Sequence, residues 1–113
     1  MASFQNGSSS LDIGKILLGD KWKVNIIIHL YSGPKRYGEL LNIDDSITKK
    51  VLTENLKELE ELDILSRNEE INNNIKNVFY NLTETGVSLI PIINNIIEWC
   101  LEYTKKHRED IEK

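Results

Sequence analysis

The stretch SITKKVLTENLKELEEL, residues 46–62, gathers cationic and hydroxyl side chains at one end and carboxylates at the other. Ammonium groups bind phosphates and guanine edges, and a threonine contacts phosphates or thymine methyls. Taken alone, such residues are more typical of a solvated helix face, and the surrounding elements must decide between the two interpretations. The cationic and hydroxyl side chains near the start of this stretch are Thr48, Lys49, Lys50 and Thr53.

Residues 46–62 are predicted to form one amphipathic helix that is capped by Ser46. Ile47, Val51, Leu52, Leu56 and Leu59 follow the i, i+4, i+7 spacing of a buried helix face. The polar residues named above fall on the complementary face.

Three helical segments are predicted before this helix. Residues 11–19 are predicted to form a short helix capped by Ser10, and residues 21–32 a helix capped by Asp20. The second of these is apolar on most sides, which places it at the centre of the fold. Residues 35–43 give a further short helix, so the segment at 46–62 is the fourth.

A hairpin and a long helix are predicted to follow. Two strand-like runs flank INNNIK within residues 64–82, and its asparagines suit the left-handed backbone of a hairpin tip. Thr83 caps a long apolar helix that Pro91 kinks or splits in two. The expected fold is mainly α with a small two-stranded β hairpin.

Length and composition limit the classes of function. The 113 residues suit one domain at 10–113, preceded by a flexible N-terminal arm at 1–9. A single cysteine and two distant histidines indicate a cytoplasmic protein with neither a disulfide nor a metal site, and we expect no cofactor. No apolar run is long enough to span a membrane, and we expect residues 1–10 not to act as a secretory signal. No arrangement of residues supports an enzyme.

The formal net charge of −4 argues against indiscriminate binding of nucleic acid. It does not exclude binding through one local face, because exposed charges are screened beyond about 8 Å at physiological salt. The order of the elements is that of a winged helix-turn-helix, with residues 46–62 as the recognition helix and the hairpin at about 64–82 as the wing.

Five motifs in order resemble those of the HxlR-type transcriptional regulators, a bacterial group close to the MarR-like winged helices. The resemblance covers about residues 11–103. It implies a winged helix-turn-helix with N- and C-terminal dimerisation helices. The motifs are G-x-K-W at 19–22, G-P-x-R-[FY]-x-E-L at 33–40, I-[ST]-x-K-x-L-T-x-x-L-x-x-L at 47–59, V-x-Y-x-L-T-x-x-G at 78–86, and Trp99.

Three positions depart from the family pattern. Asp63 stands where members carry glycine at the end of the recognition helix, and a left-handed aspartate is tolerated there at some cost. The wing lacks a proline pair. Ser8, Ser9 and Ser10 occupy the region where many members have a sensing cysteine.

A recognition helix reads DNA with its first turns and outer face, while flanking cations contact the backbone. Tyr37 is interpreted as a packing aromatic in preference to a DNA contact. The acids at the end of the helix are expected to face away from DNA. The expected DNA-binding residues are Lys35, Arg36, Thr48, Lys49, Lys50, Thr53, Asn55, Lys57, Asn73 and Lys76.

The two ends of the chain hold more apolar residues than one core needs, so they are candidates for a homodimer interface. Burial in the core of the single chain is an equal alternative for each residue. For Cys100 a small buried hydrophobe is favoured over a reactive thiol. The interface candidates are Leu11, Ile16, Ile93, Ile96, Ile97, Cys100 and Tyr103.

The leading hypothesis is a dimeric, sequence-specific DNA-binding transcriptional regulator, and family likeness favours a repressor. It would bind a near-palindromic operator on double-stranded DNA and respond to an unknown small-molecule effector. The alternative is a winged-helix protein-interaction module without DNA binding, which the acidic net charge and the unusual wing suggest.

Overall fold

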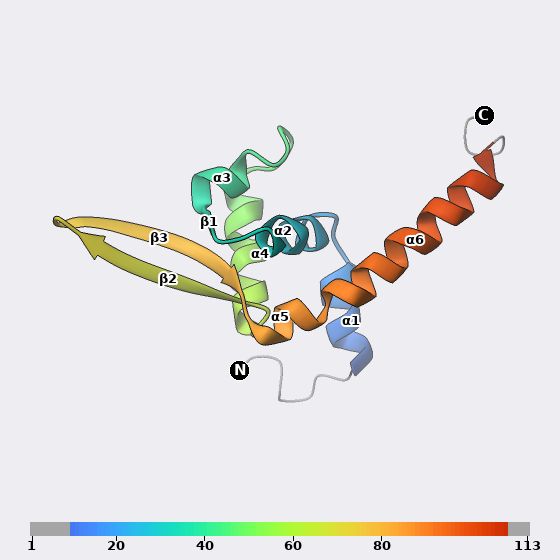
Figure 1. The fold of residues 1–113 in the computed structure, drawn as a ribbon, viewed down its shortest axis with the longest axis horizontal. Helices are drawn as coiled ribbons and strands as arrows, with labels where there is room; N and C mark the ends of the chain where they lie inside the picture. Colours follow the sequence, from blue (N-terminus) through green and yellow to red (C-terminus); the bar gives the residue numbers. More distant parts are fainter. Residues whose placement is uncertain (1–9, 109–113) are drawn as a thin grey trace.

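The computed structural model describes residues 10–108; the expected arm at 1–9, with Ser8 and Ser9, and residues 109–113 lie outside the described part. The order of the elements confirms the predicted winged helix-turn-helix (Figure 1). In chain order they are α1 (Ser10–Leu18), α2 (Trp22–Tyr31), β1 (Lys35–Arg36), α3 (Tyr37–Leu41), α4 (Lys49–Glu61), β2 (Leu65–Asn72), β3 (Ile75–Leu82), α5 (Glu84–Ser88) and α6 (Ile90–Lys106).

The predicted hairpin is present, and a short third strand extends it. The three strands are antiparallel in the order β1-β3-β2. Lys35 pairs with Tyr80 and Arg36 with Phe79, so the short helix predicted from residue 35 begins only at Tyr37. The helical prediction failed at 35 and 36 because the pairing partners lie more than 40 residues away. The tip turns through Asn73 and Asn74, with left-handed φ values of 52° and 65°.

The core lies where α2, α4 and the base of the sheet meet. Helix α2 is central, as its pattern predicted, and α4 faces it with the leucines of its apolar stripe. Burial of this kind is worth about 1.5–3 kcal/mol for each large apolar side chain, and it decides how the helices pack. The fully buried side chains are Ile26, Ile27, Leu40, Leu52, Leu59 and Leu65.

Thr83 organises the junction between the wing and the last helices. Its hydroxyl lies within hydrogen-bond distance of the carbonyls of Asp63 and Ile64 and accepts from the Gly86 N–H at 3.1 Å. Asp63 adopts the left-handed conformation expected at the end of the recognition helix, with φ 61°. The long C-terminal helix is split after α5, and Pro91 stands in the first turn of α6, where its missing N–H costs no helix bond.

Two arms project from the core on opposite sides, the β2–β3 hairpin and α6 (Figure 1). The radius of gyration is 16.3 Å, whereas a compact chain of this length has about 13 Å. Because the two arms extend away from the core, both are available for contacts outside the single chain.

No helix within residues 10–108 combines the length and apolarity needed to cross a bilayer.

Candidate nucleic-acid interface

Helix α4 begins two residues later than the sequence predicted. Thr48 is its N-cap, with its hydroxyl accepting from the Val51 N–H at 3.2 Å. The predicted cap, Ser46, instead donates from both its N–H and its hydroxyl to Asp44 Oδ1. These two hydrogen bonds hold the pKa of the Asp44 carboxyl below its usual range. Lys49 and Lys50 are consequently the first two residues of α4, where backbone N–H groups and the helix dipole favour an anion.

The outer face of α4 carries most of the predicted contacts, with one correction. Thr48, Lys49, Lys50, Thr53 and Lys57 are exposed. Asn55 is only 3% exposed, so the prediction that it reads a base is wrong for this conformation. It lies three residues after Leu52 and four before Leu59, which places it on the buried stripe of the helix.

Tyr37 packs α3 against the start of α4, as the interpretation of it as a packing aromatic expected. Its hydroxyl donates to the Lys49 carbonyl at 3.0 Å and lies 2.9 Å from Thr53 Oγ1. The Thr53 hydroxyl is therefore engaged within the protein. Its methyl group is the part that can contact a thymine.

The two cations ahead of α3 differ in their surroundings. The Lys35 ammonium donates to Ser32 Oγ at 3.0 Å and to the Gly33 carbonyl at 3.4 Å, next to the end of α2. Arg36 is exposed, and its backbone N–H donates to Glu39 Oε1 at 3.0 Å. Arg36 is thus the freer candidate for a phosphate contact.

The wing carries two cations on either side of one carboxylate. Glu69 accepts from Arg67 Nη1 at 2.8 Å and pairs with Lys76 Nζ at 3.0 Å. The hydrogen bonds from Arg67 and Lys76 lower the pKa of Glu69. Lys76 and Asn73 were predicted as DNA contacts, but Arg67 was not, although its position in the predicted strand could have indicated it.

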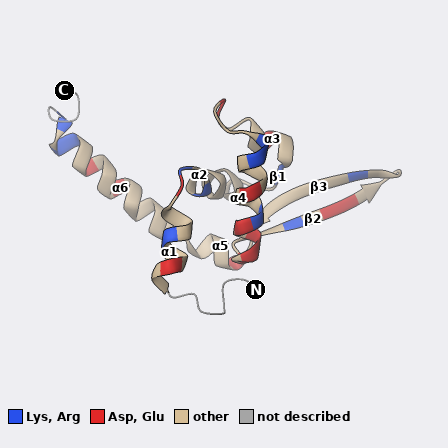
Figure 2. Cartoon of the chain, turned by 180° about the vertical axis from the view of Figure 1, so that it is seen from behind, with Lys and Arg blue, Asp and Glu red and all other residues tan. Residues whose placement is uncertain are grey.

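Charge is unevenly distributed over the molecule (Figure 2). Blue marks the start of α4 and parts of the wing, and red bands follow in the later turns of α4. Within residues 10–108, no group of three or more His, Cys, Asp or Glu side chains is placed to hold a metal ion. The start of α4 is therefore basic, and the wing carries both basic and acidic side chains.

Comparison with known proteins agrees with this geometry. Residues 17–108 match the HxlR-like helix-turn-helix family. The chain belongs to this family. It is 38% identical over 99 residues to the HTH-type transcriptional regulator YkvN of Bacillus subtilis (strain 168), covering 88% of this chain and 83% of YkvN.

Solved structures of regulators share the fold of this HxlR-like chain. Reduced YodB from B. subtilis superposes with a TM-score of 0.71 at 34% identity, covering 80% of this chain and 89% of YodB. A MarR-family regulator from Enterococcus faecalis V583 superposes with a TM-score of 0.75 at 28% identity, covering 96% and 99%. The chain is therefore a DNA-binding transcriptional regulator of the helix-turn-helix type.

Most of the predicted interface residues of this HxlR-like chain are exposed, but two are not. Ile93 is 6% exposed and belongs to the core, so its assignment to an interface is corrected. Cys100 is exposed in the single chain, contrary to the expectation of a buried thiol. Ile16 is half-buried. The exposed candidates are Leu11 at 68%, Ile96 at 43%, Ile97 at 40% and Tyr103 at 45%; Trp99 and Leu101, each 65% exposed, were missed.

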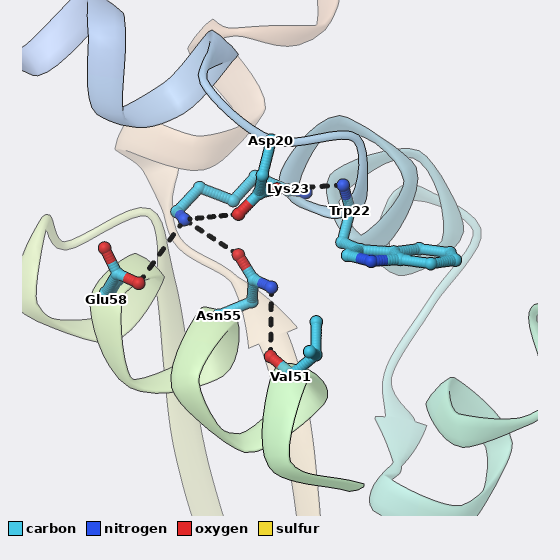
Figure 3. A network of polar contacts seen from close by, with 6 residues as sticks. All are labelled: Asp20, Trp22, Lys23, Val51, Asn55 and Glu58. Carbon is cyan, nitrogen blue, oxygen red and sulfur yellow. Dashed lines mark hydrogen bonds and ion pairs between the residues drawn. The ribbon is translucent and has the colours of Figure 1, made fainter. Parts of the chain in front are cut away.

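Lys23 was also missed, although it contacts the recognition helix. It is 2% exposed, and its ammonium pairs with Asp20 and Glu58 and donates to Asn55 (Figure 3). Partial burial raises the pKa of Asp20, but hydrogen bonds from Lys23 and from the Trp22 and Lys23 backbone outweigh it and leave the pKa lowered. The burial of Lys23 could have been predicted from its spacing. Lys23 precedes Ile26, Ile27 and Leu30 by three, four and seven residues, which places it on the same buried helix face.

Proposed function

We propose that the chain is a homodimeric repressor in the cytoplasm that binds a near-palindromic operator. Helix α4 enters the major groove, and the β2–β3 hairpin lies along the flanking backbone as the wing. The observation that carries this proposal is the exposed cationic start of α4, at Lys49 and Lys50, in the recognition position of an HxlR-like fold. Repression is taken from family likeness.

The projecting α6 supports the homodimer. Trp99 and Tyr103 stack on its surface with ring centroids 5.2 Å apart, and Leu101 is largely exposed. Apolar surface of this extent on a soluble chain marks an interaction site. A two-fold pairing through α1 and α6 would place two recognition helices about 34 Å apart, one DNA turn.

The proposal is tested by selecting duplexes from a random DNA library with the full-length protein. Enriched duplexes should contain inverted repeats with half-site centres about ten base pairs apart, and affinity should fall steeply with salt. Sedimentation should give a dimer. Absence of any enriched sequence would contradict operator binding and favour a protein-interaction module. Enriched sites without symmetry, or a monomer, would contradict the dimer alone.

The wing provides a prediction from its charges. Glu69→Gln removes the carboxylate that pairs with Arg67 and Lys76. Lys76 then becomes available to a phosphate, whereas Arg67 keeps its side-chain hydrogen bond to Tyr80. We expect two- to five-fold tighter binding to the selected duplex, in line with exposed ion pairs of about 0.2–1 kcal/mol. The slope of log affinity against log salt should steepen by about one. Fluorescence anisotropy at several salt concentrations measures both quantities.

Glu60→Gln is the matched control, since Glu60 is an exposed acid in the last turn of α4 and loses the same charge. It should change affinity by less than Glu69→Gln. Equal gains from the two variants would mean that net charge alone controls binding, and that the wing does not contact DNA.

A further inference from the structure

Lys23 is a buried cation at the place where α2 crosses α4. Its ammonium lies 2.7 Å from Asn55 Oδ1, 3.0 Å from Asp20 Oδ2 and 3.5 Å from Glu58 Oε1 (Figure 3). Each of its three N–H groups thus has an acceptor within reach. Two of these acceptors belong to α4 and the third to the turn before α2, so the ammonium joins two elements of the fold.

Both ends of this link are fixed in place. Asp20 Oδ1 accepts from the backbone N–H groups of Trp22 at 2.8 Å and Lys23 at 3.1 Å, which holds the carboxylate on the first turn of α2. On the other side, the Asn55 side-chain amide donates to the Val51 carbonyl at 2.9 Å. The Asn55 oxygen is therefore held toward Lys23, and the link has one geometry.

This link is not needed to explain why the two helices adhere. Leu52, Leu56 and Leu59 already bury the facing side of α4. A buried ion pair is weak evidence for stability, because apolar residues of similar volume often replace one without loss. The hydrogen bonds instead fix the rotation of α4 about its axis. Leucine contacts tolerate small rotations of a helix, because they are not directional, whereas a 2.7 Å hydrogen bond does not tolerate them.

The rotation of α4 matters because of what its other side carries. Lys50, Thr53 and Lys57 lie about 140–160° around the helix axis from Asn55, at about 100° per residue. With a helix radius of about 5–6 Å including side chains, a rotation of about 20° moves their tips by about 2 Å. That displacement exceeds the tolerance of a hydrogen bond to a base edge.

We propose that Lys23 is a positioning residue that fixes the rotation of α4 on α2 and so determines how sharply the outer face of α4 discriminates between DNA sequences. This inference rests on the proposed function, since it requires that α4 reads DNA. Lys23 does not touch the DNA, and it acts through Asn55 and Glu58.

The test replaces both buried polar partners in the double variant Lys23→Met/Asn55→Leu. The probes are the duplex selected by the wild-type protein and a scrambled duplex of the same composition, with unfolding in urea measured in parallel. We expect unfolding free energy equal to or above that of the wild type. Affinity for the selected duplex should fall about tenfold, equivalent to one well-formed base contact, whereas affinity for the scrambled duplex should fall less than twofold.

Lys21→Met is the matched control. Lys21 is exposed, and its ammonium lies 4.7 Å from the centroid of the Trp22 ring. The substitution removes the same charge, so it should lower the affinity for both duplexes equally. The single variant Lys23→Met leaves the Asn55 oxygen without its donor and should be less stable, yet it should lose discrimination to the same degree. An unchanged ratio of affinities in a folded double variant would overturn the proposal. So would failure of both variants to fold, because Lys23 would then hold the fold together. If the wild type selects no duplex, the proposed function itself fails.

Discussion

Replacing Lys49 and Lys50 together with alanine is expected to weaken binding to the selected duplex by about 30-fold. Both lysines stand in the first turn of α4. Under the proposed function each would contact a phosphate or a guanine edge, at roughly 1 kcal/mol apiece. The slope of log affinity against log salt should become shallower by about two. Alanine is the strongest helix former, so the fold should persist. Anisotropy titrations across a range of salt concentrations measure the effect.

The pair Lys105→Ala and Lys106→Ala is the matched control, because it removes the same two charges from the last turn of α6. It should lower affinity only slightly. A loss equal to that at α4 would show that binding depends on net charge and not on the recognition helix. Unchanged binding after the α4 substitutions would contradict the placement of α4 in the major groove.

The parts of the fold that could be predicted are those that neighbouring residues determine. The apolar spacing within α4 gives its buried face, and consecutive asparagines give the left-handed turn at Asn73 and Asn74. Asp63, the residue that departs from the family glycine, takes the left-handed conformation that its position predicts. Each of these follows from the backbone preferences of a few adjacent residues.

The parts that could not be predicted depend on residues distant in the sequence. Lys23 and Asn55 are 32 positions apart, and the hydrogen bond that joins these two buried polar side chains depends on how α2 packs on α4. Lys35 is extended because Tyr80 pairs with it across the sheet. Asn55 shows the consequence for the site, because its residue type suggested a base contact while its position on the helix already placed it inside.

Gly86→Ala is expected to destabilise the folded chain by about 3 kcal/mol. A Cβ at this position would lie 2.1 Å from the carbonyl oxygen of Ile64 and 3.0 Å from Leu82 Cδ2. That carbonyl cannot withdraw freely, since it accepts from the Thr83 N–H at 3.0 Å. Overpacking against backbone costs about 1–3 kcal/mol and occasionally more, because the backbone has to shift. Urea unfolding followed by circular dichroism, at fixed protein concentration, measures the loss.

Gly38→Ala is the control for this substitution, because a Cβ at Gly38 in α3 meets nothing within 4 Å. Alanine there should leave stability unchanged or raise it by up to about 1 kcal/mol. If Gly86→Ala costs less than about 0.5 kcal/mol, α5 can move away from Ile64 without penalty, and the junction is not rigid. A rigid junction has a consequence for DNA binding, since α5 connects the wing to α6. It would fix the position of the wing relative to the arm through which we propose that two chains associate.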